Sequence, residues 1–113
     1  MRISPQQDPV GARRILVRHR PAANTIAEAT QAADPERRHV LTGFVAHYSD
    51  GASGFASVQI DGTEQFQVPF HAANPTIELP FPLVTAKNQA VSVEVPAAGV
   101  GITGESVIFG WTE

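Results

Sequence analysis

The fold is decided by the stretch HVLTGFVAHYSDGASGFASVQIDGTEQFQV, residues 39–68. Successive side chains of a strand point to opposite faces, so apolar residues at alternate positions lie on one face. The first ten residues of the stretch predict such a strand, with these side chains on its buried face: Val40, Phe44, Ala46 and Tyr48.

Two turns follow this strand. SDGASG, residues 49–54, is rich in residues that favour turns. A second strand comes next, in which Ala56, Val58 and Ile60 alternate with polar residues. It ends at Asp61-Gly62, a dipeptide that favours the positive φ angles of a type I′ hairpin turn. We therefore expect a hairpin at residues 61–62.

Four more runs predict strands towards the C-terminus. They cover residues 66–70, 77–81, 91–95 and 106–112. Pro69 indicates an edge position, because proline cannot donate a hydrogen bond to a neighbouring strand. In the last run we expect one buried face to carry Val107, Phe109 and Trp111. Short alternating strands at close spacing predict an all-β fold, an antiparallel β-sandwich resembling a jelly roll.

The first 38 residues have a weaker pattern. A short strand fits residues 15–18, and residues 24–38 fit either a short helix or a strand. Ile26 is the only large apolar residue of TIAEAT, too little for a helix that must bury a face, and this favours the strand. We expect an extended basic N-terminal arm over residues 1–23 and a β-sandwich domain over residues 24–113.

Charge divides the chain in the same way. Residues 1–38 contain seven Lys/Arg and four Asp/Glu, a difference of +3, whereas residues 39–113 contain one against seven, a difference of −6. The arm has no aromatic residue to stack on bases, and the body is acidic, so we expect no nucleic-acid binding. We expect the arm to bind carboxylates of a neighbouring protein, since the planar guanidinium contacts them in a bidentate manner. The candidate partner-binding residues are Arg13, Arg14, Arg18 and Arg20.

No residue pattern supports catalysis, a cofactor or a metal. GVGITG contains Gly99, Gly101 and Gly104 at dinucleotide-binding spacing, but a strand rather than a helix is predicted after it, so we expect a turn. His39 and His47 would lie about 26 Å apart along one strand face, and His19 and His71 are not at metal-binding spacing either. We expect polar-face or loop histidines, no metal, no cofactor and no enzyme.

The chain contains no cysteine, which is compatible with assembly in a reducing cytosol. A membrane-spanning helix needs roughly 20 apolar residues, and no stretch approaches that length. The N-terminus lacks the apolar segment of a signal peptide. We therefore expect no membrane association and no export by a signal peptide.

Two segments carry a resemblance to a known family. ADPERRHVLTGFVAHYSDGASGFASVQIDG, residues 33–62, and VSVEVPAAGVGITGESVIFGWTE, residues 91–113, resemble small structural proteins of tailed phages and prophages, the head decoration or auxiliary proteins. The matching residues are His39, Val40, Thr42, Gly43, Asp61, Gly62, Ala98, Gly99, Gly101, Thr103, Gly104 and Trp111.

The resemblance implies a virion component on the capsid surface, assembled in the host cytoplasm, with a jelly-roll-like sandwich. It implies as partners the major capsid protein and neighbouring copies of the chain, with a trimer favoured, and no catalytic residues. The alternative is a tail-associated module that binds a carbohydrate or receptor through exposed aromatic side chains. Its candidate residues are Tyr48, His71 and Trp111.

Overall fold

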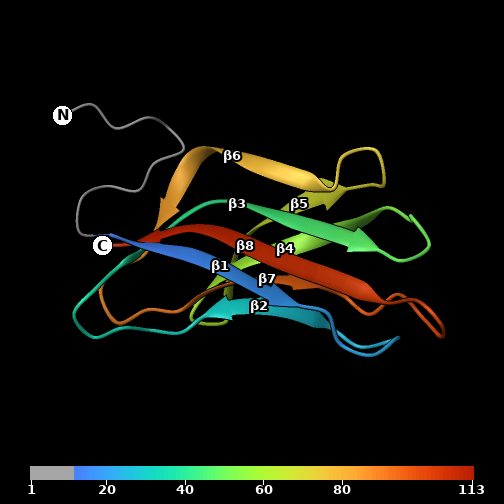
Figure 1. The fold of residues 1–113 in the computed structure, drawn as a ribbon, viewed down its shortest axis with the longest axis horizontal. Coiled ribbons are helices and arrows are strands. Elements are labelled where there is room, and N and C mark those ends of the chain that lie inside the picture. The colour runs from blue at the N-terminus through green and yellow to red at the C-terminus, as the bar shows by residue number, and fades with distance from the viewer. Residues whose placement is uncertain (1–11) are drawn as a thin grey trace.

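Two four-stranded antiparallel sheets pack face to face in the computed structural model, which describes residues 12–113 (Figure 1). The expected all-β sandwich is therefore confirmed. In chain order the strands are β1 (Arg13–His19), β2 (Ala27–Gln31), β3 (His39–Tyr48), β4 (Gly54–Ile60), β5 (Thr63–Phe70), β6 (Thr76–Val84), β7 (Val91–Val95) and β8 (Gly104–Thr112).

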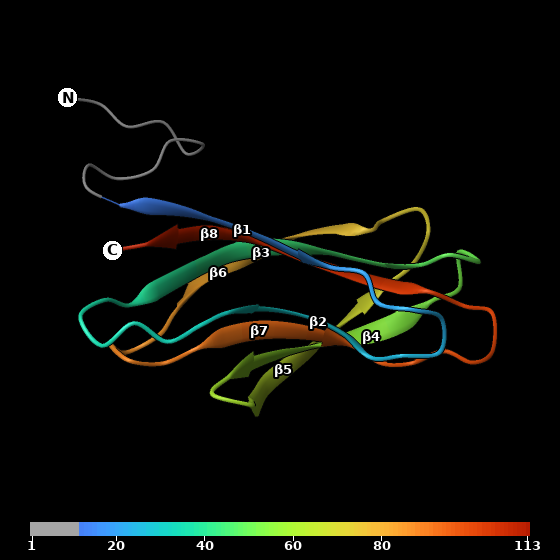
Figure 2. The ribbon, with the colours of Figure 1, turned by 60° about the horizontal axis from the view of Figure 1, so that its bottom comes forward.

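The strand order is that of a jelly roll. One sheet, sheet A, has the order β1-β8-β3-β6, and the other, sheet B, has the order β2-β7-β4-β5. Figure 2 shows the two layers, with the chain passing from one to the other at most connections. The pairs β1 with β8, β2 with β7, β3 with β6 and β4 with β5 are all antiparallel. The fold is therefore one long hairpin, rolled into two layers.

The tip of this hairpin is the predicted turn. Asp61 has φ 51° and Gly62 has φ 77°, the left-handed values that a type I′ turn requires at both central positions. Residues at similar distances from the turn pair with each other: Ile60 with Thr63, Val40 with Val84, and Arg13 with Thr112.

The core lies between the sheets and consists of side chains from every strand, some fully and some partly buried. The fully buried members are Ile15, Ala27, Ala29, Leu41, Phe44, Ala46, Tyr48, Ala56, Val58, Phe70, Val91, Val93, Val95 and Ile108. The Tyr48 and Phe70 rings contact each other at 5.3 Å between centroids. Burial of one aromatic or branched aliphatic side chain contributes about 1.5 to 3 kcal/mol, so these layers dominate the stability.

A β-bulge changes the predicted face of β3. The register shifts between Leu41 and Gly43, which places Leu41 in the core cluster with Phe44. Val40 is buried but does not belong to that cluster, so its expected position on the Phe44 face is wrong. His39 is buried as well, instead of lying on a polar face with His47.

The predicted buried face of β8 is also wrong. Ile108 and Ser106 are fully buried, whereas Val107, Phe109 and Trp111 are partly exposed on the outer face of sheet A. Alternation favoured the outer face because it carries three large apolar residues, whereas Ile108 is the only large apolar residue of the inner face. The Ser106 hydroxyl fits the core because it donates a hydrogen bond of 2.7 Å to the Val93 carbonyl.

The N-terminal region is more ordered than expected. The strand predicted at residues 15–18 extends over Arg13–His19 and forms the edge of sheet A. The strand interpretation of residues 24–38 is confirmed by β2. An arm that ends at residue 23 is wrong, because β1 belongs to the sandwich through its pairing with β8. Residues 1–11 of the expected arm lie outside the described residues.

Pro69 and the glycines of the GVGITG motif have the positions that the sequence predicted. Pro69 is in β5, which is an edge strand of sheet B, as expected. Gly99 and Gly101 have φ 121° and 80° in the connection between β7 and β8. A strand follows them, so the GVGITG motif is a turn and not the start of a helix.

Two glycines of β8 provide a test of the packing at the bulge. A Cβ atom on Gly110 would overlap the Val40 carbonyl oxygen, a backbone atom that cannot move aside. A Cβ on Gly104 would meet Val95 Cγ1 at 3.3 Å, a side chain that can adjust. We expect Gly110→Ala to lower the free energy of unfolding by about 3 kcal/mol and Gly104→Ala by about 1 kcal/mol or less. Urea unfolding measures both, and equal losses would contradict the close approach at the bulge.

Candidate functional site

The four candidate arginines are exposed and lie on or next to one edge strand. Arg13, Arg14 and Arg18 belong to β1, and Arg20 follows it directly. Ile15 of β1 is buried in the core. Because side chains alternate, Arg14 and Arg18 lie on the outer face of sheet A. Arg14 and Arg18 already have interactions within this chain, so the binding role predicted for the four arginines stays a prediction.

Arg18 belongs to a charged cluster across three strands. Its Nε donates to Glu105 Oε2, and His47 Nε2 lies 2.6 Å from Glu105 Oε1. His47 pairs directly with Glu105 between β3 and β8, and Arg18 faces Val107, two residues further along β8. The Glu105 side chain is only 11% exposed under these two partners. The cluster joins β1, β8 and β3 on the outer face of sheet A.

Two opposing effects determine the acidity of Glu105. Burial raises the pKa of this carboxyl, but hydrogen bonds from His47 and Arg18, together with their charges, outweigh burial and lower the pKa below its ordinary value. The carboxylate is therefore the stable form of Glu105 in the folded protein.

Apolar side chains surround this cluster on the outer face of sheet A. Leu16 of β1 is 70% exposed and pairs with Phe109 of β8. The Phe109 ring lies against Gly43, where a Cβ atom would come within 2.5 Å of it. Gly43 therefore leaves the space that the Phe109 ring occupies.

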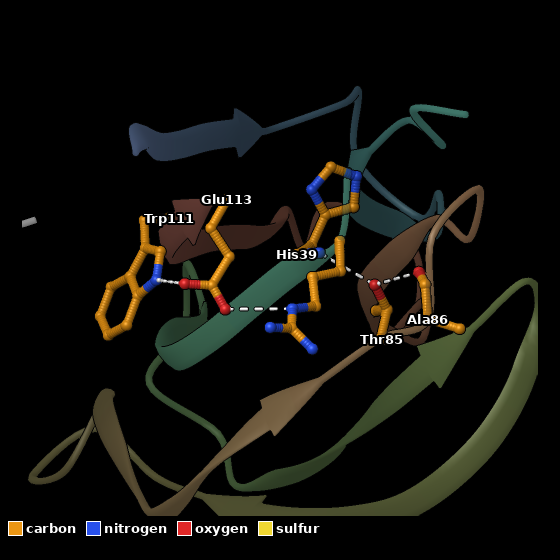
Figure 3. A network of polar contacts seen from close by, with 6 residues as sticks. His39, Thr85, Ala86, Trp111 and Glu113 are labelled. Carbon is orange, nitrogen blue, oxygen red and sulfur yellow. Dashed lines mark hydrogen bonds and ion pairs between the residues drawn. The ribbon is translucent and has the colours of Figure 1, made fainter. Parts of the chain in front are cut away.

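Trp111 continues this surface towards the end of β8. Its indole Nε1 donates to Glu113 Oε2 at 3.4 Å, and Arg38 Nε donates to the other oxygen of Glu113 at 3.1 Å. Figure 3 shows the Trp111 ring beside Glu113. The carboxylate thus joins an indole and a guanidinium at the rim of the sheet.

His39 is a structural residue in the interior. Its Nε2 lies 2.7 Å from the Ala32 carbonyl, which can only accept, so Nε2 donates, and its Nδ1 lies 2.8 Å from the Thr112 hydroxyl. The His39 backbone N–H donates to Thr85, whose hydroxyl donates to the Ala86 carbonyl (Figure 3). Within residues 12–113, no group of three or more His, Asp or Glu side chains is placed to hold a metal ion.

The carbohydrate-binding candidates are separated. Tyr48 is buried in the core, and its hydroxyl donates to the Pro96 carbonyl at 2.7 Å. Burial and then the negative charge of Asp50 raise the pKa of its phenol. Trp111 lies on the outer face of sheet A, and His71 is exposed after β5. No common binding surface contains all three.

A polar hollow of about 670 Å³ lies on the outer face of sheet B. Gln59 Nε2 donates to Ser57 Oγ and to Glu94 Oε2, and Gln67 Nε2 donates to Glu64 Oε1. Phe55, which is 58% exposed, forms part of the wall. The hollow offers hydroxyl, amide and carboxylate groups beside the exposed Phe55 ring, and the buried Tyr48 also lines it.

An apolar groove of about 630 Å³ lies between the edge strands β5 and β6. Its lining residues are Phe66, Val68, Ile77, Glu78, Leu79, Pro80, Phe81, Pro82 and Leu83. β6 departs from β3 between its paired residues Glu78 and Leu83, so four residues of β6 have no partner there. The ring of Phe81 is 83% exposed in this segment.

No protein-family model, no curated protein and no solved structure matches this chain. The resemblance to phage structural proteins therefore stays a prediction. Among residues 12–113 no helix is long and apolar enough to span a membrane.

Sequence reasoning did not find the Glu105 cluster or the groove. The three members of the cluster lie far apart in the chain, and only the pairing of β1, β8 and β3 brings them together. The groove results from the departure of β6 from β3. The two prolines at residues 80 and 82 were the available signal, because they exclude regular pairing there.

The Glu105 cluster predicts a specific pH dependence. Because the folded state lowers the pKa of Glu105, its contribution is present above the ordinary glutamate pKa and is lost as the pH falls through the lower folded value. We expect Glu105→Gln to lower the free energy of unfolding at neutral pH by about 1 to 2 kcal/mol and to flatten its decrease in acid. Urea unfolding across acidic pH measures this, with Glu78→Gln as the exposed control. An unchanged acid profile in Glu105→Gln would contradict the cluster.

Proposed function

We propose that this chain is a non-enzymatic structural protein of a phage virion, a decoration protein that binds and stabilises the capsid. The observation that carries the proposal is a basic, exposed edge strand on a sandwich of opposite charge. Arg13 and Arg20 are exposed and have no hydrogen bond or ion pair within the described part of the chain. The resemblance of residues 33–62 and 91–113 to phage head proteins supports the same role.

Binding to the lattice would use the basic edge. Clustered guanidinium groups bind carboxylates of a neighbouring protein in a planar, bidentate geometry. β1 fixes the backbone of three of the candidate arginines, so the backbone entropy of ordering this segment is already lost before the partner binds. The partners are the major capsid protein and neighbouring copies of this chain, assembled in the host cytoplasm and arranged as trimers on the capsid surface.

The protein would work without a cofactor, because a protein that stabilises a capsid by binding its subunits needs only surface contacts. The connections of residues 49–53, 71–75 and 96–103 lie at one end of the sandwich, and a backbone hydrogen bond from Ser49 to Thr103 joins two of them. This end would be presented to the surroundings of the particle.

A second candidate is supported by the polar hollow of sheet B. Hydroxyl and carboxylate groups beside the exposed Phe55 ring are the groups that contact a sugar, as in a tail-associated carbohydrate-binding or receptor-binding module. The capsid role is favoured because Trp111 belongs to sheet A, away from the hollow, and Tyr48 lines the hollow but is only 7% exposed, which leaves little of its ring for a sugar to stack on.

The first test is the copy number in purified particles from the source genome, by quantitative mass spectrometry. We expect a number of copies of the same order as the major capsid protein. A handful of copies would indicate a tail position and the second candidate, and complete absence would overturn the virion role.

The role of the arginines in capsid binding is tested by adding the purified chain and its variants to particles that lack the chain, and by measuring how much of each variant binds. We expect Arg13→Glu/Arg20→Glu to lower particle occupancy at least tenfold, because two attractive contacts become repulsive. Lys87→Glu, a single charge reversal on the exposed connection between β6 and β7, is expected to bind as the unchanged chain does. Deletion of residues 1–23 is unsuitable because it removes β1. Equal binding by all variants would contradict a role for the arginines.

A further inference from the structure

The sandwich has two lateral edges of different character. The strands β1 and β2 form one of them, and β5 and β6 form the other, because these are the outer strands of the two sheets. We call them the β1–β2 edge and the β5–β6 edge. A sandwich does not close on itself, so both edges need protection from uncontrolled association.

The β5–β6 edge is apolar and is open between the sheets. Its groove exposes Phe81 by 83% and Phe66 by 38%. Exposed aromatic rings grouped around a hollow are typical of protein interaction sites. Three prolines, at residues 69, 80 and 82, lack the N–H group that an added strand needs. The groove therefore suits inserted side chains better than an added strand.

The β1–β2 edge has the complementary composition. Leu16 of β1 is 70% exposed, and Ile26, which precedes β2, is 49% exposed. Arg13 and Arg20 lie at the two ends of β1 and have no hydrogen bond or ion pair to any residue that the structure describes. On the other edge, Glu78 lines the groove without a hydrogen bond or ion pair to any described residue. One edge thus presents aliphatic side chains among cations, and the other presents an apolar groove with a carboxylate.

We propose that the β1–β2 edge of one copy docks in the β5–β6 groove of a second copy, with Leu16 or Ile26 in the groove and an arginine against Glu78. Joining two equal edges is disfavoured. Joining two grooves would bring Glu78 of one copy close to Glu78 of the other, and joining two β1 strands would bring their arginines together. Both arrangements place like charges next to each other. The contact is therefore heterologous, a head-to-tail arrangement that forms a closed ring when the rotation allows.

This inference deepens the self-association that belongs to the proposed function, but it needs no capsid. If the chain assembles in solution but is absent from particles, the self-association proposal stands and the virion role is wrong. If the chain is abundant in particles but monomeric in solution, the virion role stands and the self-association proposal is wrong.

The experiment measures the mass of the purified full chain by light scattering after size exclusion. We expect an oligomer for the unchanged chain. We expect monomers for Phe81→Glu, which places a charge in the groove, and for Arg13→Glu/Arg20→Glu. Circular dichroism checks that each variant is folded. Phe55→Glu, the same substitution at an exposed ring of sheet B, and Lys87→Glu are the matched controls, and both are expected to stay oligomeric.

Mixing the two monomeric variants identifies the geometry. Phe81→Glu retains an intact β1–β2 edge, and Arg13→Glu/Arg20→Glu retains an intact groove, so an equimolar mixture contains one functional interface. We expect a heterodimer and no larger species. A mixture that stays monomeric, an unchanged chain that is monomeric, or full assembly by either variant would overturn the proposal.

Discussion

The turn at Asp61 and Gly62 is the constraint on which the rest of the structure depends. Both residues have positive φ, a conformation that glycine adopts without cost and that aspartate tolerates better than most residues. The turn starts the pairing of β4 with β5, and the other three strand pairs follow outwards along the same hairpin. A one-residue slip at this turn would turn every side chain of β4 or β5 to the wrong face. The register of the edge strands β5 and β6, and so the form of the groove, depends on it as well.

Local signals were sufficient for the strands and the hairpin, because turn chemistry and alternation act over a few residues. They failed where pairing between distant strands decides the outcome. In β8 the face with the larger apolar side chains, Val107, Phe109 and Trp111, points outward, and the choice of Ile108 for the core reflects packing against sheet B, which no local pattern contains. In β3 the bulge at Leu41 to Gly43 moves His39 into the interior, where three hydrogen bonds to its backbone N–H and ring nitrogens hold it. The partner of Arg18, one of the candidate arginines, could be found only from the register of β1 with β8.

The residues that carry the resemblance to phage head proteins have clear structural duties. Thr42 donates to the Phe109 carbonyl at the bulge, and Gly43 makes room for the Phe109 ring. Gly99 and Gly101 allow positive φ in the last connection. These residues determine how the jelly roll is built, whereas the surfaces that would bind partners, the β1–β2 edge and the groove, lie mainly outside the matching segments. Fold and binding are thus encoded in largely separate parts of this chain.

Because β1 pairs antiparallel with β8, Arg13 lies opposite Thr112, and the two ends of the sandwich chain are neighbours (Figure 1). Short connections between such neighbouring ends allow circular permutation of a domain. Linking them would turn the rolled hairpin into a closed loop of chain, and opening that loop at the connection of residues 96–103 would make β8 the first strand. The same proximity means that a peptide or protein fused to the C-terminus would emerge beside β1 at the end of the sandwich opposite the connections of residues 49–53 and 71–75, so cargo could be carried there while those loops stay uncovered.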